Sequence, residues 1–171
     1  MPRYKKNHRV LSIYPTSRGY AFVLFESPLS PQDWGNKDLK KDVGNAKCIA
    51  SIRDMLDRFR PDVLVLEDPS ERQTKRSIRI RRILKAITPT TQELSIEIAL
   101  LKRKDVRAAF AQFGATNKQD IAEVIARKME AFAVRLPRAR KAWQAEDHRM
   151  AVFDAASRGL TYYYRLDSDG Q

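Results

Sequence analysis

Short apolar runs alternate with turn-forming residues in the first part of the chain. Residues 10–13 and 20–25 are rich in β-branched, aromatic and aliphatic side chains, and the segment Pro-Thr-Ser-Arg-Gly at 15–19 separates them. Runs of this length and composition are typical of β-strands, and proline and glycine between them favour a turn. The pattern therefore predicts a β-hairpin. A third short strand is expected around Trp34, although the prolines before it are unusual inside a sheet.

The middle of the chain changes to a helical period. Between residues 45 and 59, apolar residues recur at steps of three and four, which places them on one face of a helix. Residues 62–67 then form an almost continuous apolar run of strand length, which ends in the acidic Glu67. Helices on both sides would bury such a run completely if it were a central parallel strand. We expect a helix followed by a buried strand.

Helices and strands continue to alternate toward the C-terminus. The pattern predicts a strand over 96–101 and helices over 71–87, near 108–113, after a cap at Thr116 or Asn117, and over about 145–158. Alternation of this kind after an opening run of strands indicates a mixed α/β fold. We therefore expect a five-stranded mixed sheet, with three antiparallel strands followed by parallel ones and helices on both faces.

The balance of charge favours a polyanionic partner. The chain has 33 Lys and Arg residues against 21 Asp and Glu, a formal net charge of +12. Basic segments lie at 72–85, 102–107 and 135–141, although a solvated helix face explains the first of them equally well. The candidate nucleic-acid contacts are Arg72, Lys75, Arg76, Arg79, Arg82, Lys102, Lys104, Lys118, Arg138 and Arg140.

Several classes of protein are excluded by composition. The single cysteine, Cys48, rules out an internal disulfide framework and a Cys-rich zinc site, which favours a reducing intracellular setting. No apolar run reaches the roughly 18 residues that a membrane span needs, and we expect no signal peptide. The length of 171 residues fits one domain, with flexible basic residues at 1–9 and a polar tail at 167–171. A cytoplasmic location is expected.

Acidic residues occur at two places that matter for metal binding. Glu67 closes the buried strand, and Glu146 and Asp147 lie where the last helix is expected to begin. Carboxylates at a strand end and on a helix are typical ligands of Mg²⁺. An acidic pocket within a positive surface suits a metal-dependent enzyme that acts on nucleic acid. For Glu67, hydration at the strand end and pairing with a basic residue remain open alternatives.

The order of the elements and four local strings resemble a known family. The strings are residues 11–20 (Leu-Ser-Ile-Tyr-Pro-Thr-Ser-Arg-Gly-Tyr), 65–67, 114–121 and 146–152. In this order and spacing they resemble the RuvC-like Holliday-junction resolvases, which belong to the ribonuclease H-like superfamily. The resemblance extends from about residue 10 to residue 158.

The resemblance implies a site with two Mg²⁺ ions, held by carboxylates from the first strand, the fourth strand and the last helix. It makes Glu67 and Asp147 the metal ligands and catalytic residues, with Glu146 as a substitute. Where the resemblance calls for the first-strand aspartate, the chain has Tyr14, a neutral phenol that is a poor ligand for a hard cation. Asp154 lies about two helical turns beyond Asp147, so we expect a structural role for it.

Two functions therefore remain open. One is a crossover-junction endonuclease that cuts branched DNA during recombination with Mg²⁺ or Mn²⁺. The other is a noncatalytic DNA-binding or assembly protein that has kept the nuclease fold and needs no cofactor. A basic RNA-binding protein of the translation machinery would explain the charge but not the acidic residues. A homodimer is what the resemblance suggests.

Overall fold

The computed structural model describes residues 8–39, 45–137 and 149–169, together with the side chains of these residues up to Arg165. Its centre is a five-stranded sheet with the order β3-β2-β1-β4-β5. The first three strands form an antiparallel meander, and β4 pairs parallel to β1 and to β5. Their bounds are β1 Val10–Thr16, β2 Gly19–Ser27, β3 Ser30–Asp38, β4 Val63–Glu67 and β5 Glu97–Leu101. The predicted mixed sheet is confirmed.

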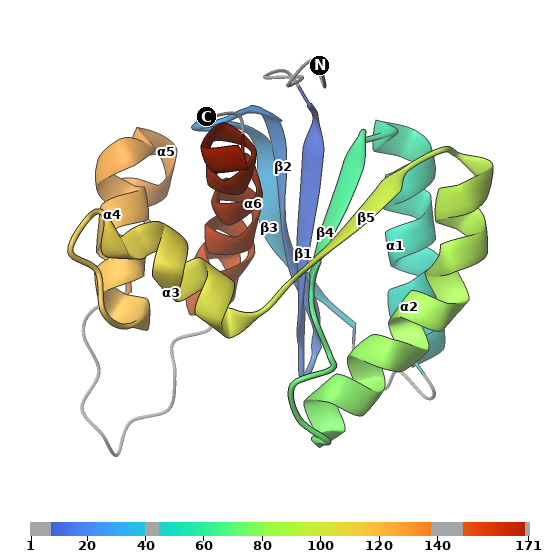
Figure 1. Ribbon diagram of the computed structural model, residues 1–171. Coiled ribbons are helices and arrows are strands. Elements are labelled where there is room, and N and C mark those ends of the chain that lie inside the picture. Colours follow the sequence, from blue (N-terminus) through green and yellow to red (C-terminus); the bar gives the residue numbers. More distant parts are fainter. Residues whose placement is uncertain (1–7, 40–44, 138–148, 170–171) are drawn as a thin grey trace.

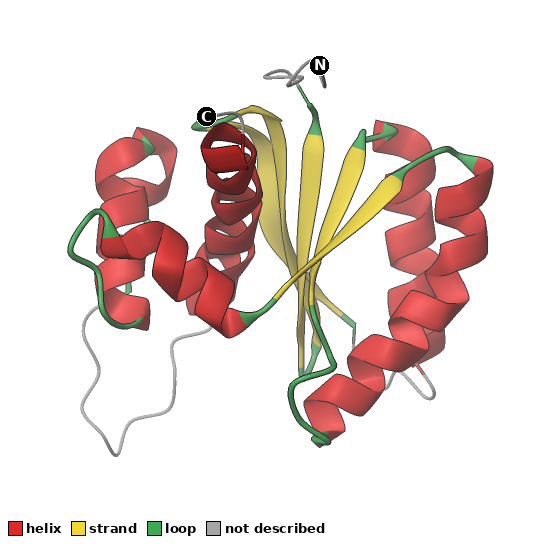
Figure 2. Cartoon of the chain, viewed as in Figure 1, coloured by secondary structure: helices red, strands yellow, loops and turns green. Residues whose placement is uncertain are grey.

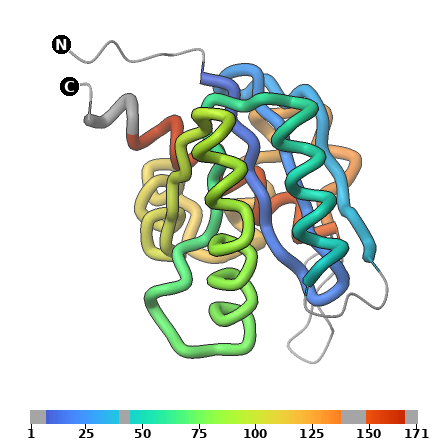
Figure 3. Tube along the Cα trace, turned by 90° about the vertical axis from the view of Figure 1, so that its right-hand side faces the viewer, coloured from blue at the N-terminus to red at the C-terminus, as the bar shows by residue number. Residues whose placement is uncertain are grey.

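Helices cover both faces of this sheet (Figures 1 and 2). On one face lie α1 (Ala46–Phe59) and α2 (Lys75–Glu93), which run side by side in Figure 3. The other face is covered by α6 (Met150–Asp169), and α3 (Arg103–Ala111), α4 (Lys118–Lys128) and α5 (Glu130–Ala133) pack around that helix. Within the described residues, no helix is long and apolar enough to cross a membrane.

Alternation along β1 separates two hydrophobic cores. Leu11 and Ile13 are buried against α1 and α2, whereas Val10 is buried on the face that α6 covers. Ser12 lies on this second face, where its hydroxyl donates a hydrogen bond of 2.6 Å to the carbonyl oxygen of Ala155 in α6. Successive strand residues point to opposite faces, so Tyr14 belongs to the face of α6 as well.

Some predicted boundaries were wrong. The helix predicted over 71–87 begins at Lys75, because Thr74 caps it and forms a capping box with Ser77, and it continues past Pro89 to Glu93. The last helix extends to Asp169 rather than ending near 158, because Leu160 and the tyrosines after it still bury their side chains. Residues 138–148 lie outside the described residues, and with them the predicted start of that helix.

Buried tyrosines predict a loss of stability at alkaline pH. Burial raises the pKa of Tyr20 and Tyr162 to about 12, and it raises the pKa of Tyr163 as well. Above the ordinary phenol pKa of about 10, unfolded chains release these protons while the native state keeps them, so the free energy of unfolding falls as pH rises toward the native values. Urea denaturation at about pH 8 and about pH 11 should show this loss, which Tyr20→Phe should reduce. Equal stability at the two values would contradict the prediction.

Candidate functional site

The carboxyl ends of β1 and β4 lie side by side. Ser12 pairs with Val65 in the parallel ladder, so the same register brings Tyr14 next to Glu67 two residues further along. Both side chains then point to the face of α6. Tyr14 and Glu67 are far apart in the sequence, but they lie close together here because β1 and β4 end at the same edge of the sheet.

Two arginines bind the carboxylate of Glu67. The Nε and Nη2 atoms of Arg76 both lie 2.8 Å from Oε2, and Nη2 of Arg158 lies 3.6 Å from Oε1. Arg76 also donates from Nη1 to the carbonyl oxygen of Pro15, and Arg158 donates from Nη1 to that of Asp154. The Arg158 side chain is only 5 % exposed and that of Glu67 15 % exposed. Pairing with basic residues, one of the three alternatives for Glu67, is what the structure shows.

The ring of Tyr14 lies among the same cations. The guanidinium carbon of Arg76 is 4.1 Å from the ring centroid, that of Arg158 is 4.8 Å from it, and Nζ of Lys118 is 5.8 Å from it. Cations at such distances are attracted to the negative face of an aromatic ring. Tyr14 therefore interacts with these cations through its ring, a contact that a carboxylate in its place would not make.

Asp154, for which the sequence predicted a structural role, is the second carboxylate of this cluster. Its Oδ2 atom lies 3.1 Å from Nζ of Lys118, and its side chain is 7 % exposed. Asp154 and Arg158 are four residues apart on α6, so they share a helix face. That spacing was the signal in the sequence that the two side chains lie close together. Asp147 and Glu146 lie outside the described residues, and their predicted roles stay predictions.

The described residues at this edge do not fit a divalent cation. Three cations, Arg76, Arg158 and Lys118, meet two carboxylates, Glu67 and Asp154. Mg²⁺ and Mn²⁺ bind where oxygen ligands with negative charge predominate, and a surplus of positive charge opposes them. Among the described residues, no group of three or more His, Cys, Asp or Glu side chains could hold a metal ion. Metal binding by Glu67 stays a prediction. Its carboxylate is already paired with two arginines.

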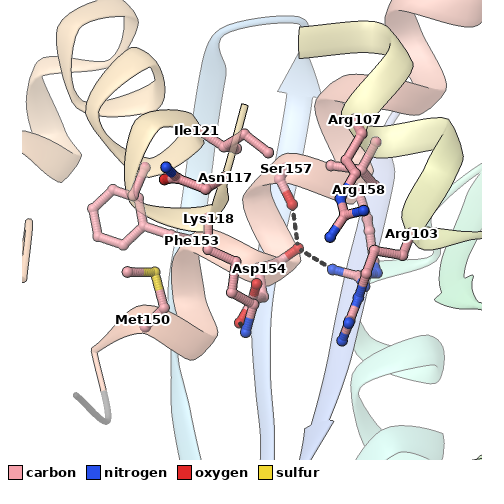
Figure 4. Close-up of a pocket in the computed structure, with 12 residues that line it drawn as sticks. Arg103, Arg107, Asn117, Lys118, Ile121, Met150, Phe153, Asp154, Ser157 and Arg158 are labelled. Carbon is pink, nitrogen blue, oxygen red and sulfur yellow. Dashed lines mark hydrogen bonds and ion pairs between the residues drawn. The ribbon is translucent and has the colours of Figure 1, made fainter. Parts of the chain in front are cut away.

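A basic pocket of about 280 Å³ opens beside the cluster, between α3, α4 and α6. Figure 4 shows Arg103, Arg107 and Arg158 on one side, with Met150 and Phe153 across from them. The charged residues that line it are Arg103, Arg107, Lys118, Arg158 and Asp154. Four cations around one carboxylate make this pocket suitable for an anion.

A second pocket lies on the side of α2. Its volume is about 300 Å³, and Glu67, Arg72 and Arg76 are among the residues that line it. Arg103 lines both pockets. Asp68, which also lines the second pocket, accepts hydrogen bonds from Ser70, and these hold the pKa of its carboxyl below the ordinary value. Charges of both signs are close to balance here, so the second pocket is less suited to an anion than the first.

Solved structures of one protein match this arrangement of elements. The structure of Thermus thermophilus RuvC in complex with a Holliday junction substrate has a TM-score of 0.69 and 16% identity, with 94% of this chain and 96% of that chain covered. A second structure of Thermus thermophilus RuvC has a TM-score of 0.64 and 18% identity over the same shares of the chains. The chain has a RuvC-like fold. No protein-family model matches the sequence, and no curated protein does.

The predicted nucleic-acid contacts divide into four groups, the last of which lies outside the described residues. Lys118 lines the basic pocket, while Arg76 and Arg79 are committed inside the molecule, Arg79 to Asn45 and to the carbonyl oxygen of Gly19. Exposed or half-exposed at the surface are Arg72, Lys75, Arg82, Lys102 and Lys104. Arg138 and Arg140 lie outside the described residues. Arg158 was not among the predicted contacts, whereas Arg103 and Arg107 were included only through the basic segment at 102–107.

Proposed function

We propose that this RuvC-like chain binds DNA, and branched DNA in particular, through the basic pocket between α3, α4 and α6. The observation that carries the proposal is the set of four cations around a single carboxylate in that pocket. The similar fold of Thermus thermophilus RuvC, whose structure contains a Holliday junction, supports the choice of a branched substrate.

Arg103 and Arg107 are the side chains best placed to meet a phosphate. They lie four residues apart on α3, so they share a helix face, and both are exposed. Within the described part of the chain, neither forms an ion pair with a carboxylate. A guanidinium with free donors binds phosphate oxygens in pairs and releases counter-ions from the nucleic acid.

Metal-dependent cleavage is the second candidate function. The position of Glu67 at the carboxyl end of a central strand favours it, with Asp147 and Glu146 as further ligands and Mg²⁺ or Mn²⁺ as the cofactor. The pairing of Glu67 with Arg76 and Arg158 opposes it. We therefore place binding without cleavage first.

A labelled four-way junction and a linear duplex of matched sequence test both candidates, each with EDTA and with Mg²⁺ or Mn²⁺. We expect the junction to bind more tightly than the duplex and to remain uncut. Failure to bind either DNA would refute the proposal. Metal-dependent cutting by the wild type that is lost in Glu67→Ala would establish the second candidate instead.

Removing the two arginines of α3 should weaken binding and reduce its dependence on salt. For the Arg103→Gln/Arg107→Gln variant we expect a dissociation constant raised roughly tenfold or more, and a slope of log K against log salt reduced by about 2. Arg58→Gln/Arg127→Gln is the matched control, because both arginines are exposed and neither lines the pocket. Fluorescence anisotropy over a salt series measures both quantities. Equal effects of the two variants would mean that the pocket is not the binding site.

Two further expectations stay predictions. They are the formation of a homodimer and a part in recombination. Sedimentation equilibrium with and without DNA tests the first of them.

A further inference from the structure

We propose that Arg76 and Arg158 are resident counter-ions of Glu67, which take the place of a divalent cation at this edge of the sheet. Glu67 is then a positioning residue that holds two guanidinium groups rather than a metal ligand. The part of the inference that concerns DNA rests on the proposed function, whereas the part that concerns metal stands on the geometry alone.

The two guanidinium groups that bind the carboxylate come from helices on opposite faces of the sheet. Arg76 comes from α2 and binds Oε2, and Arg158 comes from α6 and binds Oε1. Each oxygen of Glu67 thus has its own cation. A divalent ion would have to displace at least one of them to bind the same oxygens.

Displacement of Arg158 is opposed by its surroundings. Its side chain is 5 % exposed, and it is held by Glu67, by the carbonyl oxygen of Asp154 and by the ring of Tyr14. Its Nε atom, which is buried, has no hydrogen-bond partner among the described residues. The group is therefore held largely by charge and by the aromatic ring at this one place.

The third cation makes the exclusion of metal stronger. Lys118 lies over the same ring and binds Asp154, so the second carboxylate is also paired. With three positive and two negative groups, the cluster keeps a positive charge at a place that adjoins the basic pocket. A permanent charge of this kind attracts phosphate without help from Mg²⁺.

A titration with Mn²⁺ tests the metal part directly. We expect the melting temperature of the wild type to be the same in millimolar Mn²⁺ or Mg²⁺ as in NaCl of equal ionic strength. We also expect the electron paramagnetic resonance spectrum to show no Mn²⁺ bound to the free protein. Binding of Mn²⁺ by the wild type that disappears in Glu67→Gln would overturn the inference.

The Glu67→Gln variant tests the DNA part. If Glu67 neutralises two arginines, its loss releases their charge, and we expect the dissociation constant for the four-way junction to fall several-fold, in EDTA as in Mg²⁺. The salt slope should become steeper by about 1. Weaker binding, or binding that requires Mg²⁺ in the wild type, would contradict the inference. If the wild type bound no DNA at all, the proposed function would fail, and the Mn²⁺ titration would still decide the resident counter-ions.

A variant with the opposite design should gain a metal response. In Tyr14→Asp/Arg76→Gln/Arg158→Gln, one added carboxylate beside Glu67 replaces the ring, and both guanidinium groups are gone. At Mn²⁺ concentrations well above the dissociation constant, the metal should raise the melting temperature of this variant by about 5 °C or more. Tyr14→Asn/Arg76→Gln/Arg158→Gln is the matched control without the added carboxylate. A folded variant with no response would show that the two guanidinium groups are not what excludes a cation. Should the variant not fold, the wild-type titration decides.

Discussion

Replacement of Gly159 by leucine is expected to destabilise the protein strongly. A Cβ atom at this position would lie 2.4 Å from Cε2 of Phe25 and 3.3 Å from Cβ of Ser12. Phe25 is completely buried, so its ring has no free space to move into. Overpacking of a dense core costs about 1 to 3 kcal/mol and occasionally more, and leucine adds three more carbons beyond the Cβ atom. We expect a loss of roughly 3 kcal/mol or more.

Urea denaturation followed by circular dichroism measures this loss. Gly35→Ala is the matched control, because a Cβ atom there meets only the ring of Phe22 at 3.7 Å, an ordinary contact. The control should change the free energy of unfolding by less than about 1 kcal/mol. Wild-type stability in Gly159→Leu would show that α6 does not approach the sheet as closely as the structure has it.

The second large effect is expected from Arg158→Leu. The change removes the cation that binds Oε1 of Glu67 and the donor to the carbonyl oxygen of Asp154. Breaking a buried ion pair costs about 3 to 5 kcal/mol, and here Arg76 still binds the carboxylate, so we expect about 2 to 4 kcal/mol. For a chain of this length, that corresponds to a fall in melting temperature of roughly 4 to 16 °C.

A double-mutant cycle with Glu67→Gln separates the ion pair from the packing of Arg158. If the two groups interact as the structure has them, the double variant should lose less than the sum of the single losses, by about 0.5 to 3 kcal/mol. Additive losses would mean that Arg158 contributes through packing alone. Arg18→Leu serves as a control, because that arginine is 74 % exposed and 4.0 Å from its partner Asp38; its change should cost less than about 1 kcal/mol.

The strands were predictable because their signals are local. The runs at 10–13, 20–25 and 62–67 consist of residues that fit a buried pleated surface, and each ends at a turn or a polar residue. The edge strand β3 was placed correctly around Trp34 but was longer than expected, from Ser30 to Asp38. The helix ends were less predictable, since capping at Thr74 and burial after Leu160 depend on tertiary contacts.

The site was predictable only in part, because its contacts join distant parts of the chain. Glu67 stood out as a carboxylate at the end of an apolar run, but its partners could not be chosen from the sequence. Arg76 was one of several basic residues on its helix, and Arg158 lies in a segment with no strong charge pattern. Their meeting at Glu67 requires the parallel register of β1 and β4 and the close approach of α6 to the sheet.

The pairing of Glu67 with arginines from both helical layers has a consequence for cooperativity. Most contacts in a sheet covered on two faces are confined to one layer, so each layer can in principle open without the other. Here α2 and α6 share one carboxylate at the sheet edge. If α2 or α6 opens at that end, the arginine of the other helix is left with a carboxylate that has lost one of its two cations. The two layers should therefore exchange their amide hydrogens at this edge as a single unit, although the sheet lies between them.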